Sequence, residues 1–382
     1  MIYVDNNATT PMAVEVAEAL SQAYQSAFLN PASQHQAGQK ARRRLDDTRE
    51  SILNLVGGEI TRFASDRLVF TSGGTEANNL ALFGLGGDIP GQVVISAVEH
   101  PSIREAAEHL AKLGQSMEVL PVDSAGVVQI DALRQALAQP TRLVSVMLGN
   151  NETGVLQPTA EIAQICRENG VPLHVDAVQA VGKIPVNFRE LGASAMTITP
   201  HKFHGPRGIG ALILDDRVKL NPAMFGGAQQ LAMRPGTESV ELAIGFEVAL
   251  RLAIEHQAEA EPRMRELRDR LEMLLGELIG PENITINGLD APRLPHTSNV
   301  SFSGIDRQAL VMSLDMAAVA CSTGSACASG SSEPSPTLLA SGADPSIISS
   351  SIRLSLSRFT TQAEVDEVAS RIFNCINRLR RS

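Results

Sequence analysis

The sequence has no tryptophan, and aromatic residues make up only 3% of its 382 residues. A core built from such a chain must rely on aliphatic side chains and methionine, and few rings are left on which single-stranded nucleic acid could stack. Acidic residues outnumber basic ones, and the formal net charge of −10 argues against binding to a phosphate backbone. We therefore expect no direct nucleic-acid partner.

Long apolar runs are also missing. No stretch approaches the roughly 20 consecutive apolar residues that a membrane-spanning helix needs. The first residues, Met1–Asp5, lack the basic and apolar regions of a signal peptide. These absences predict a cytoplasmic protein without a membrane partner.

Cysteine is scarce, with four residues and no CxxC pair. This number and scatter argue against a disulfide framework or a zinc-finger pattern. In a reducing compartment the four are thiols, one of which could be reactive. Cys166 and Cys375 lie on predicted apolar helix faces and are expected in the core, and Cys321 is expected to be structural. The fourth is Cys327.

The first two-thirds of the chain alternates apolar, β-rich runs with helical stretches. Continuous apolar strands joined by helices indicate an α/β domain with a mainly parallel sheet that is covered on both faces. Helices are expected from near Thr75, over Pro101–Leu113 and over Thr159–Asn169. The predicted strands are Arg67–Phe70, Gln92–Ser96, Leu143–Met147, Leu173–Asp176, Ala195–Ile198 and Gly210–Leu214.

The remainder of the chain has a different pattern, and the length of the sequence favours a second domain. One long, charged helical stretch is expected from about Val240 to Leu278. Two alternating segments, His296–Phe302 and Ser351–Leu356, read as half-buried strands, and a helix over Thr361–Arg380 follows them. Between the two strands, Ser322–Ser341 is rich in Ser, Gly, Ala and Pro and is expected to be a mobile loop.

Three motifs in the first region have the residue types of a cofactor site. Thr71–Asn79 follows a strand and opens a helix, so its small residues could cradle an anion, although a plain capped turn would look the same. Asp176 ends an apolar strand, where ligands gather in open α/β sheets, although it could simply cap a helix. Lys202 lies among glycines, prolines and histidines after another strand and could form a Schiff base, although most lysines are surface residues.

The order of these three motifs is more informative than any one of them. Pyridoxal phosphate (PLP) needs an anchor for its phosphate, a carboxylate for its pyridinium nitrogen and an amine for its aldehyde. The chain provides these groups in that order, which indicates a PLP enzyme.

With further motifs, the sequence resembles the cysteine desulfurase family of NifS/IscS type, within the aspartate-aminotransferase-like fold (PLP-dependent transferase fold type I). The resemblance covers nearly the whole chain. It implies a large domain over residues 12–255 with a mainly parallel seven-stranded sheet. It also implies a smaller α+β domain, formed by residues 1–11 and 256–382, that contains the Cys327 loop at about 322–341. The further motifs are Tyr3–Pro11, Asn30–His35, Arg234–Thr237 and Ser322–Cys327.

The resemblance also implies roles for individual residues. Lys202 would bind the cofactor covalently, Asp176 would pair with its ring nitrogen, and Gln179 would bond its phenolic oxygen. His100 would stack on the ring and assist proton transfer; the alternative is an ordinary core or solvated histidine. The phosphate would be bound by Gly74, Thr75, Thr199 and His201, and that of the neighbouring subunit by Thr237.

Because Thr237 would bind the phosphate of the neighbouring subunit, the resemblance implies a homodimer.

The resemblance also implies contacts to the substrate. Asn151 would contact the cofactor and the substrate, and Arg353 and Asn30 would contact the substrate. An arginine fork such as that of Arg353 suits a carboxylate. A surface charge on a strand is the alternative for Arg353.

The implied reaction converts L-cysteine into L-alanine and a persulfide on Cys327, the catalytic nucleophile. The sulfur would then pass to an acceptor, an iron–sulfur scaffold or a tRNA-thiolation protein. No resident metal is implied, although Cys327 could transiently ligate a cluster. Rival interpretations are selenocysteine lyase or kynureninase-like chemistry, or a non-catalytic sulfur-relay protein.

Two features depart from the family pattern. The usual Ser-Ala-His-Lys reads Thr199-Pro200-His201-Lys202, and Pro200 fixes its backbone and lacks an N–H donor. Relatives that supply scaffold proteins often have a longer C-terminal tail than this sequence, which ends at Ser382, so docking to that scaffold is not implied.

Overall fold

The computed structural model describes residues 1–61, 65–86, 90–324 and 333–381. Its largest sheet has seven strands in the order β2-β8-β7-β6-β5-β3-β4. Only β8 runs antiparallel to its neighbours, so the predicted mainly parallel seven-stranded sheet is confirmed. The strands are β2 (Arg67–Thr71), β3 (Gln92–Ser96), β4 (Ser116–Leu120), β5 (Thr141–Met147), β6 (Leu173–Asp176), β7 (Ala195–Ile198) and β8 (Gly210–Leu214).

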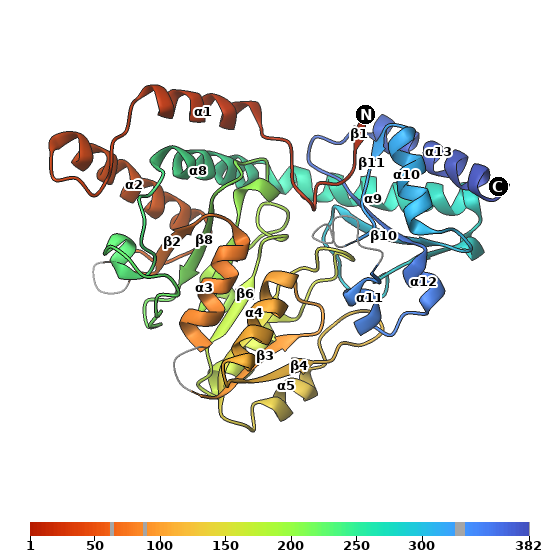
Figure 1. Cartoon of the computed structure of the whole chain (residues 1–382). Helices are drawn as coiled ribbons and strands as arrows, with labels where there is room; N and C mark the ends of the chain where they lie inside the picture. The colour runs from red at the N-terminus through yellow and green to blue at the C-terminus, as the bar shows by residue number, and fades with distance from the viewer. Residues whose placement is uncertain (62–64, 87–89, 325–332, 382) are drawn as a thin grey trace.

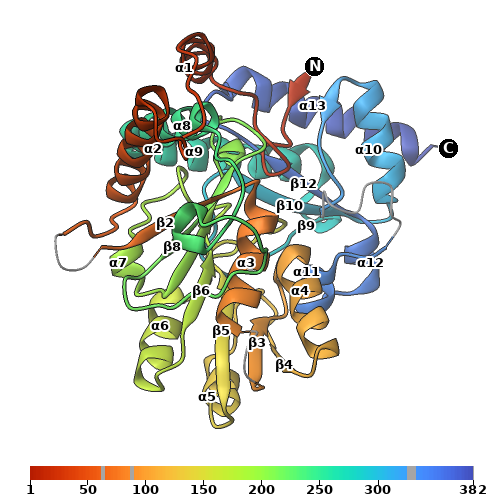
Figure 2. The same ribbon diagram turned by 60° about the vertical axis from the view of Figure 1, so that its left-hand side comes forward.

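Helices cover both faces of this sheet (Figures 1 and 2). On one face, apolar side chains of α3 and α4 pack against β2, β3, β7 and β8, whereas α2, α6 and α8 contribute to the large core on the other face. The helices of this part are α1 (Val14–Gln25), α2 (Gln36–Leu55), α3 (Gly74–Gly86), α4 (Pro101–Lys112), α5 (Ile130–Ala136), α6 (Thr159–Glu168), α7 (Phe188–Leu191) and α8 (Val240–Glu255).

The edge strand β4 is absent from the sequence prediction. Three of its five side chains are exposed, so it lacks the continuous apolar run that identifies the other strands. The long helix predicted over Val240–Leu278 is also wrong in one respect. It is two helices, α8 and α9 (Gln257–Ile279), which meet at His256 because the first packs into the large core and the second into another core.

A three-stranded antiparallel sheet, in the order β12-β10-β9, lies in the C-terminal part (Figure 1). Its core is built by α9, α10, α13 and the sheet, and β1 at the start of the chain joins it by pairing with β11. The domain limits at residues 11 and 255 remain a prediction. The elements are β1 (Ile2–Tyr3), β9 (Ile284–Ile286), β10 (Thr297–Phe302), β11 (Val319–Ala320), β12 (Ser351–Ser355), α10 (Arg307–Met316), α11 (Pro336–Ala340), α12 (Pro345–Ser349) and α13 (Gln362–Leu379).

The prediction that β10 and β12 are half buried is wrong, because every residue of both strands is buried. The polar side chains of β10 are buried through hydrogen bonds rather than exposed to water. Asn299 Nδ2 donates to the carbonyl oxygen of Glu152 (3.3 Å), and Ser301 Oγ donates to that of Ile347 (2.9 Å). An alternating pattern therefore marks a polar interface here, not a solvent face.

None of the helices in the described ranges is long and apolar enough to cross a bilayer. Cys166 and Cys375 are buried in the two main cores, as predicted, and the partly buried Cys321 packs against the second.

The turn after β7 provides a test of packing. A Cβ atom at Gly205 would lie 2.4 Å from Cβ of Pro200 and 2.8 Å from Cβ of Ala249. We expect Gly205→Ala to lower the free energy of unfolding by about 1–3 kcal/mol, because the Cβ atoms of the buried Pro200 and Ala249 are fixed to the backbone and cannot rotate away. Gly276→Ala in α9 is the control: the new Cβ would lie 3.8 Å from Ile284 Cδ1, and helix propensity should add about 0.5–1 kcal/mol. Urea unfolding measures both, and equal stabilities of the two variants would contradict this packing.

A buried histidine provides a test of pH dependence. His174 Nδ1 and Nε2 bond the hydroxyls of Ser145 and Thr197 (2.9 Å each) across three strands. Burial lowers its pKa to about 4, whereas in the unfolded chain it binds a proton near its ordinary pKa of about 6.5. Between these values the unfolded state binds more protons, so stability falls as the pH falls.

Relative to His174→Asn, we expect the wild type to lose about 1.4 kcal/mol more for each pH unit below about 6.5. Urea unfolding of both proteins at several pH values down to about 4.5 measures this difference. Parallel pH profiles would refute the assignment of a neutral, buried imidazole.

Candidate active site

Most of the predicted site residues gather at the carboxyl ends of the parallel strands of the large sheet. The strands β2, β3, β5, β6 and β7 all end on this side, where ligand sites are expected in open α/β sheets. A cavity of about 190 Å³ opens there. It is lined by nine of the predicted residues, Gly74, Thr75, His100, Asn151, Asp176, Gln179, Thr199, His201 and Lys202.

A chain of hydrogen bonds connects the strand-end carboxylate to His100. Asn78 Nδ2 donates to Asp176 Oδ2 (2.7 Å) and to Ser102 Oγ (2.9 Å). The Ser102 hydroxyl is therefore directed to His100 Nδ1, at 2.7 Å. The second Asp176 oxygen accepts from the backbone N–H of Val178 (3.0 Å). Both oxygens of Asp176 are thus held in place by donors.

The same bonds determine the tautomer of His100. Its Nδ1 also accepts from the backbone N–H of Ser102 (3.1 Å), because His100 is the N-cap of α4. Nδ1 is therefore an acceptor, and Nε2 has the proton of the neutral ring. Burial lowers the pKa of His100, the charge of Lys202 lowers it further, and Asp176 opposes both effects. A neutral ring near pH 7 can accept a proton.

Lys202 ends the short 3-10 helix η1 (Pro200–Lys202) that follows β7. Pro200 occupies the first position of this helix, where an N–H would have no intrahelical partner and the fixed φ of proline fits. The departure from the family pattern is thus accommodated locally. Lys202 Nζ donates to the carbonyl oxygens of Asn7 (2.5 Å) and Ala8 (2.9 Å).

The expected phosphate cradle is assembled from two segments. Gly74 and Thr75 form the N-terminus of α3, where backbone N–H groups favour an anion. Thr199 and His201 approach from the turn after β7. His201 Nδ1 bonds Thr9 Oγ1 (3.2 Å), and burial with the nearby charge of Lys202 lowers its pKa to about 4. His201 would therefore contact an anion as a neutral donor.

Arg353 lies behind the cavity rather than in its lining. Its side chain is 1% exposed; Nη2 pairs with Asp5 (2.7 Å), and Nη1 donates to the carbonyl oxygens of Asn151 (3.0 Å) and Gly324 (2.7 Å). Nε has no hydrogen-bond partner among the described residues. Both terminal nitrogens of the fork expected to bind a substrate carboxylate are therefore engaged within the protein.

Besides Arg353, two predicted residues among those described lie outside the cavity lining, Asn30 and Thr237. Asn30, between α1 and α2, is exposed, and its Oδ1 accepts from the backbone N–H of Ala32 (2.9 Å). Thr237 is exposed in the segment before α8. Cys327 lies outside the described residues.

Sequence analysis missed two buried carboxyl groups. Glu99, next to His100, accepts from Ser96 Oγ (2.5 Å) and from the backbone N–H of Met147 (2.8 Å), and burial raises its pKa to about 8. It ties the ends of β3 and β5 together. The only signal in the sequence is its position before His100.

The second is Glu152, which follows Asn151. It accepts from Ser335 Oγ (2.6 Å) and Thr337 Oγ1 (3.3 Å), and burial raises its pKa. This carboxyl group links the Asn151 loop to Ser335 and Thr337, at the start of α11. Both residues lie inside the segment 322–341 that is predicted to be a mobile loop, and that prediction is wrong for its last part, which is a helix with buried residues. The partners of Glu152 are more than 180 positions away, so local pattern gives no signal for them.

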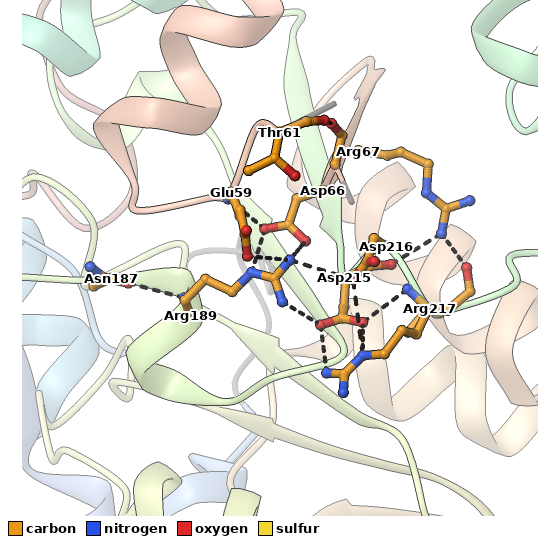
Figure 3. Close-up of polar contacts among 11 residues, drawn as sticks. Glu59, Thr61, Asp66, Arg67, Asn187, Arg189, Asp215, Asp216 and Arg217 are labelled. Atoms are coloured by element: carbon orange, nitrogen blue, oxygen red, sulfur yellow. Dashed lines mark hydrogen bonds and ion pairs between the residues drawn. The ribbon is translucent and has the colours of Figure 1, made fainter. Parts of the chain in front are cut away.

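An acidic cluster lies at the other end of the strands, next to Leu214, the last residue of β8, which pairs with Ala195, the first residue of β7. Figure 3 shows the carboxylates of this cluster and the arginines around them. Oxygens of Asp66, Asp215 and Asp216 lie within 4.8 Å of one another. Arg189 contacts all three, at 2.6, 3.0 and 3.4 Å, and Arg217 Nε approaches Asp215 (2.8 Å). The guanidinium groups neutralise the carboxylates, so the cluster is an ion-pair network that fastens α7 to the sheet.

Known proteins resemble this chain along its whole length. It matches the family model of class V aminotransferases over residues 2–368. The cysteine desulfurase IscS of Dictyoglomus turgidum is 38% identical over 382 residues, with 99% of this chain and 95% of that protein covered. The IscS-like cysteine desulfurase of Mycobacterium tuberculosis is 38% identical over 393 residues, with 100% and 98% covered.

A solved structure agrees with these relatives. The X-ray structure of a NifS-like protein from Rickettsia africae superposes with a TM-score of 0.88 at 31% identity, and the match covers 100% of both chains. The chain therefore belongs to the class V aminotransferase family and, within it, to the PLP-dependent cysteine desulfurases of the IscS/NifS type.

Proposed function

We propose that this chain binds PLP and removes sulfur from L-cysteine, leaving L-alanine and a persulfide on Cys327. The observation that supports this most strongly is the single cavity that gathers an amine, a strand-end carboxylate and an anion cradle from segments far apart in the sequence. These are the three groups that the cofactor requires. Full-length similarity to proteins named cysteine desulfurase supports the choice of substrate.

The chemistry of the lining residues fits PLP. Asp176 is 6% exposed and has both oxygens held by donors, so its carboxyl group is fixed in place at the cavity, where a cofactor ring nitrogen could pair with it. Gly74 leaves the N-terminus of α3 open, since only the side chains of Val178 and Thr199 would meet a Cβ there, at 3.3 Å or more. We assign the phosphate to Gly74, Thr75, Thr199 and His201, and the phenolic oxygen to Gln179.

When bound, PLP would withdraw electrons from the substrate's α-carbon and so weaken the neighbouring bonds. Lys202 Nζ would hold the cofactor at rest and, once released, take the proton from the α-carbon. His100, neutral and fixed through Nδ1, would cover the ring and exchange a proton at the substrate. Asn151, with Arg353 behind it, would orient the substrate carboxylate, and Asn30 is assigned to the substrate as well.

Sulfur transfer requires a thiolate. The Cys327 sulfur would form a bond to the substrate sulfur while the bond between the substrate's β-carbon and its sulfur breaks. The carbon keeps the electron pair and takes up a proton, which gives L-alanine and the persulfide. Burial raises the pKa of both Cys166 and Cys321 to about 12, so these two thiols stay protonated at neutral pH and are poor nucleophiles.

We further propose a homodimer of two-domain subunits, divided at residues 11 and 255. Thr237 and Asn30 are exposed and lie outside their own subunit's cavity, which leaves them available to a second copy. The acceptor of the sulfur would be a protein that builds iron–sulfur clusters or thiolates tRNA. The cytoplasmic location stays a prediction.

The role of Cys327 is tested by Cys327→Ala. We expect this variant to keep the yellow colour of bound cofactor but to lose alanine formation from cysteine, because no thiolate accepts the sulfur. Cys321→Ala is the matched control and should retain turnover, since its thiol is buried and protonated. Release of sulfide from cysteine by Cys327→Ala at the wild-type rate would disprove the assignment.

The role of Lys202 is tested by the visible spectrum of the purified protein. Lys202→Ala should lose the visible absorbance of the covalently held cofactor. The control is Lys183→Met, which removes a lysine that is buried (3% exposed) and should leave that absorbance in place. An unchanged spectrum in Lys202→Ala would show that another amine holds the cofactor.

A further inference from the structure

The start of the chain packs directly on the turn that contains Lys202. Besides the two bonds from Lys202 Nζ to the carbonyl oxygens of Asn7 and Ala8, the backbone N–H and the hydroxyl of Thr10 both donate to the carbonyl oxygen of His201, at 2.9 Å each. Residues nearly 200 positions apart are thus joined side by side.

Within this segment, Asn7 makes hydrogen bonds through both its backbone and its side chain, and it is buried (2% exposed). Its Nδ2 donates to the carbonyl oxygen of Asn151 (3.1 Å) and to Thr297 Oγ1 (2.9 Å). Because the amide nitrogen uses both protons there, Oδ1 is the atom that faces His296 Nε2 (2.8 Å), and that ring nitrogen must donate. The amide is therefore locked in one orientation by three partners.

The backbone of Asn7 is tied into the cofactor site as well. Its carbonyl oxygen accepts from Gln179 Nε2 (3.1 Å) in addition to Lys202 Nζ, and its N–H donates to Ser355 Oγ (2.9 Å). One residue thus contacts the cofactor lysine, two other lining residues of the cavity and strands β10 and β12. Loss of the side-chain hydrogen bonds would release the backbone of Asn7, whose carbonyl oxygen accepts from the lysine.

Carbonyl oxygens favour the protonated form of a lysine. A buried ammonium is costly unless donors find acceptors, and hydrogen bonds to the charged form raise the pKa of the amine. Whenever Lys202 is not bonded to cofactor, the carbonyls of Asn7 and Ala8 are in place to accept its protons. The proton affinity of the free amine therefore depends on where these two oxygens are held.

We propose that Asn7 is a positioning residue for Lys202: its three side-chain hydrogen bonds fix the carbonyl pair that holds the free ammonium. The inference rests on the proposed function only in taking Lys202 as the cofactor lysine. Asn7 lies 195 positions before Lys202 in the sequence, in a motif to which the sequence assigns no role.

The test is competitive labelling of Lys202 Nζ with an amine reagent over a range of pH, read by peptide mass spectrometry on the full chain after removal of cofactor. In Asn7→Ala the carbonyl pair is no longer fixed, so the labelling midpoint should move to lower pH by about one unit, equivalent to about tenfold faster labelling below the midpoint. A merely loosened structure would raise the plateau rate and leave the midpoint unchanged.

Two further variants complete the design. Thr297→Val removes one partner of the Asn7 amide and should shift the midpoint in the same direction by a smaller amount, which keeps the test open if Asn7→Ala fails to fold. Tyr3→Phe is the control, because the Tyr3 hydroxyl bonds the same segment at the carbonyl oxygens of Asp5 and Thr9 and does not contact Asn7. Its midpoint should equal that of the wild type.

Equal midpoints in wild type, Asn7→Ala and Thr297→Val would overturn the proposal. A shift in Tyr3→Phe as large as that in Asn7→Ala would also overturn it, because the effect would then belong to the segment and not to Asn7. The labelling uses no cofactor and no cysteine, so its result is independent of whether Lys202 holds the cofactor or whether cysteine is turned over.

Discussion

Two hydrogen bonds from Lys202 Nζ to the carbonyl oxygens of Asn7 and Ala8 join the parts on which the site depends. The lysine belongs to the turn after β7, and the carbonyls belong to the segment that leads from β1 into the large sheet's helices. The same segment bonds to β10 and β12 through Asn7 and Ser355. A shift of the smaller sheet would therefore change the surroundings of the lysine, because hydrogen bonds through Asn7 connect that sheet to the amine.

The charges in the cavity depend on which buried groups have hydrogen-bond partners that favour their charged form and which groups burial keeps neutral. Asp176 keeps two donors on its carboxylate, whereas His100 and His201 have lowered pKa values and are neutral near pH 7. A site with one fixed carboxylate, one amine and neutral imidazoles suits a cofactor that has both an anionic phosphate and a ring nitrogen to be protonated. Arg353 is compensated by Asp5, which places its charge behind the cavity rather than in it.

Much of this arrangement could be predicted from local sequence. The apolar runs gave six strands of the large sheet, and strand ends gave Asp176 and Lys202, because parallel strands direct ligands to one edge. The edge strand β4, the buried polar strand β10 and the break at His256 were not predictable, since each depends on what packs against it. Asn7, Glu152 and the Arg353–Asp5 pair were missed for the same reason: their partners lie more than 140 positions away.

The central claim is that Lys202 is the amine that holds the cofactor. The main alternative amine in the described structure is that of Lys183. Lys183 is buried near Lys202, and burial lowers its pKa to about 7, so it could supply a neutral amine. The most direct measurement is borohydride reduction of the purified yellow protein, followed by digestion and mass spectrometry of the peptides. The account predicts a pyridoxyl group on Lys202 and an unmodified Lys183. A pyridoxyl group on Lys183, with Lys202 unmodified, would contradict it.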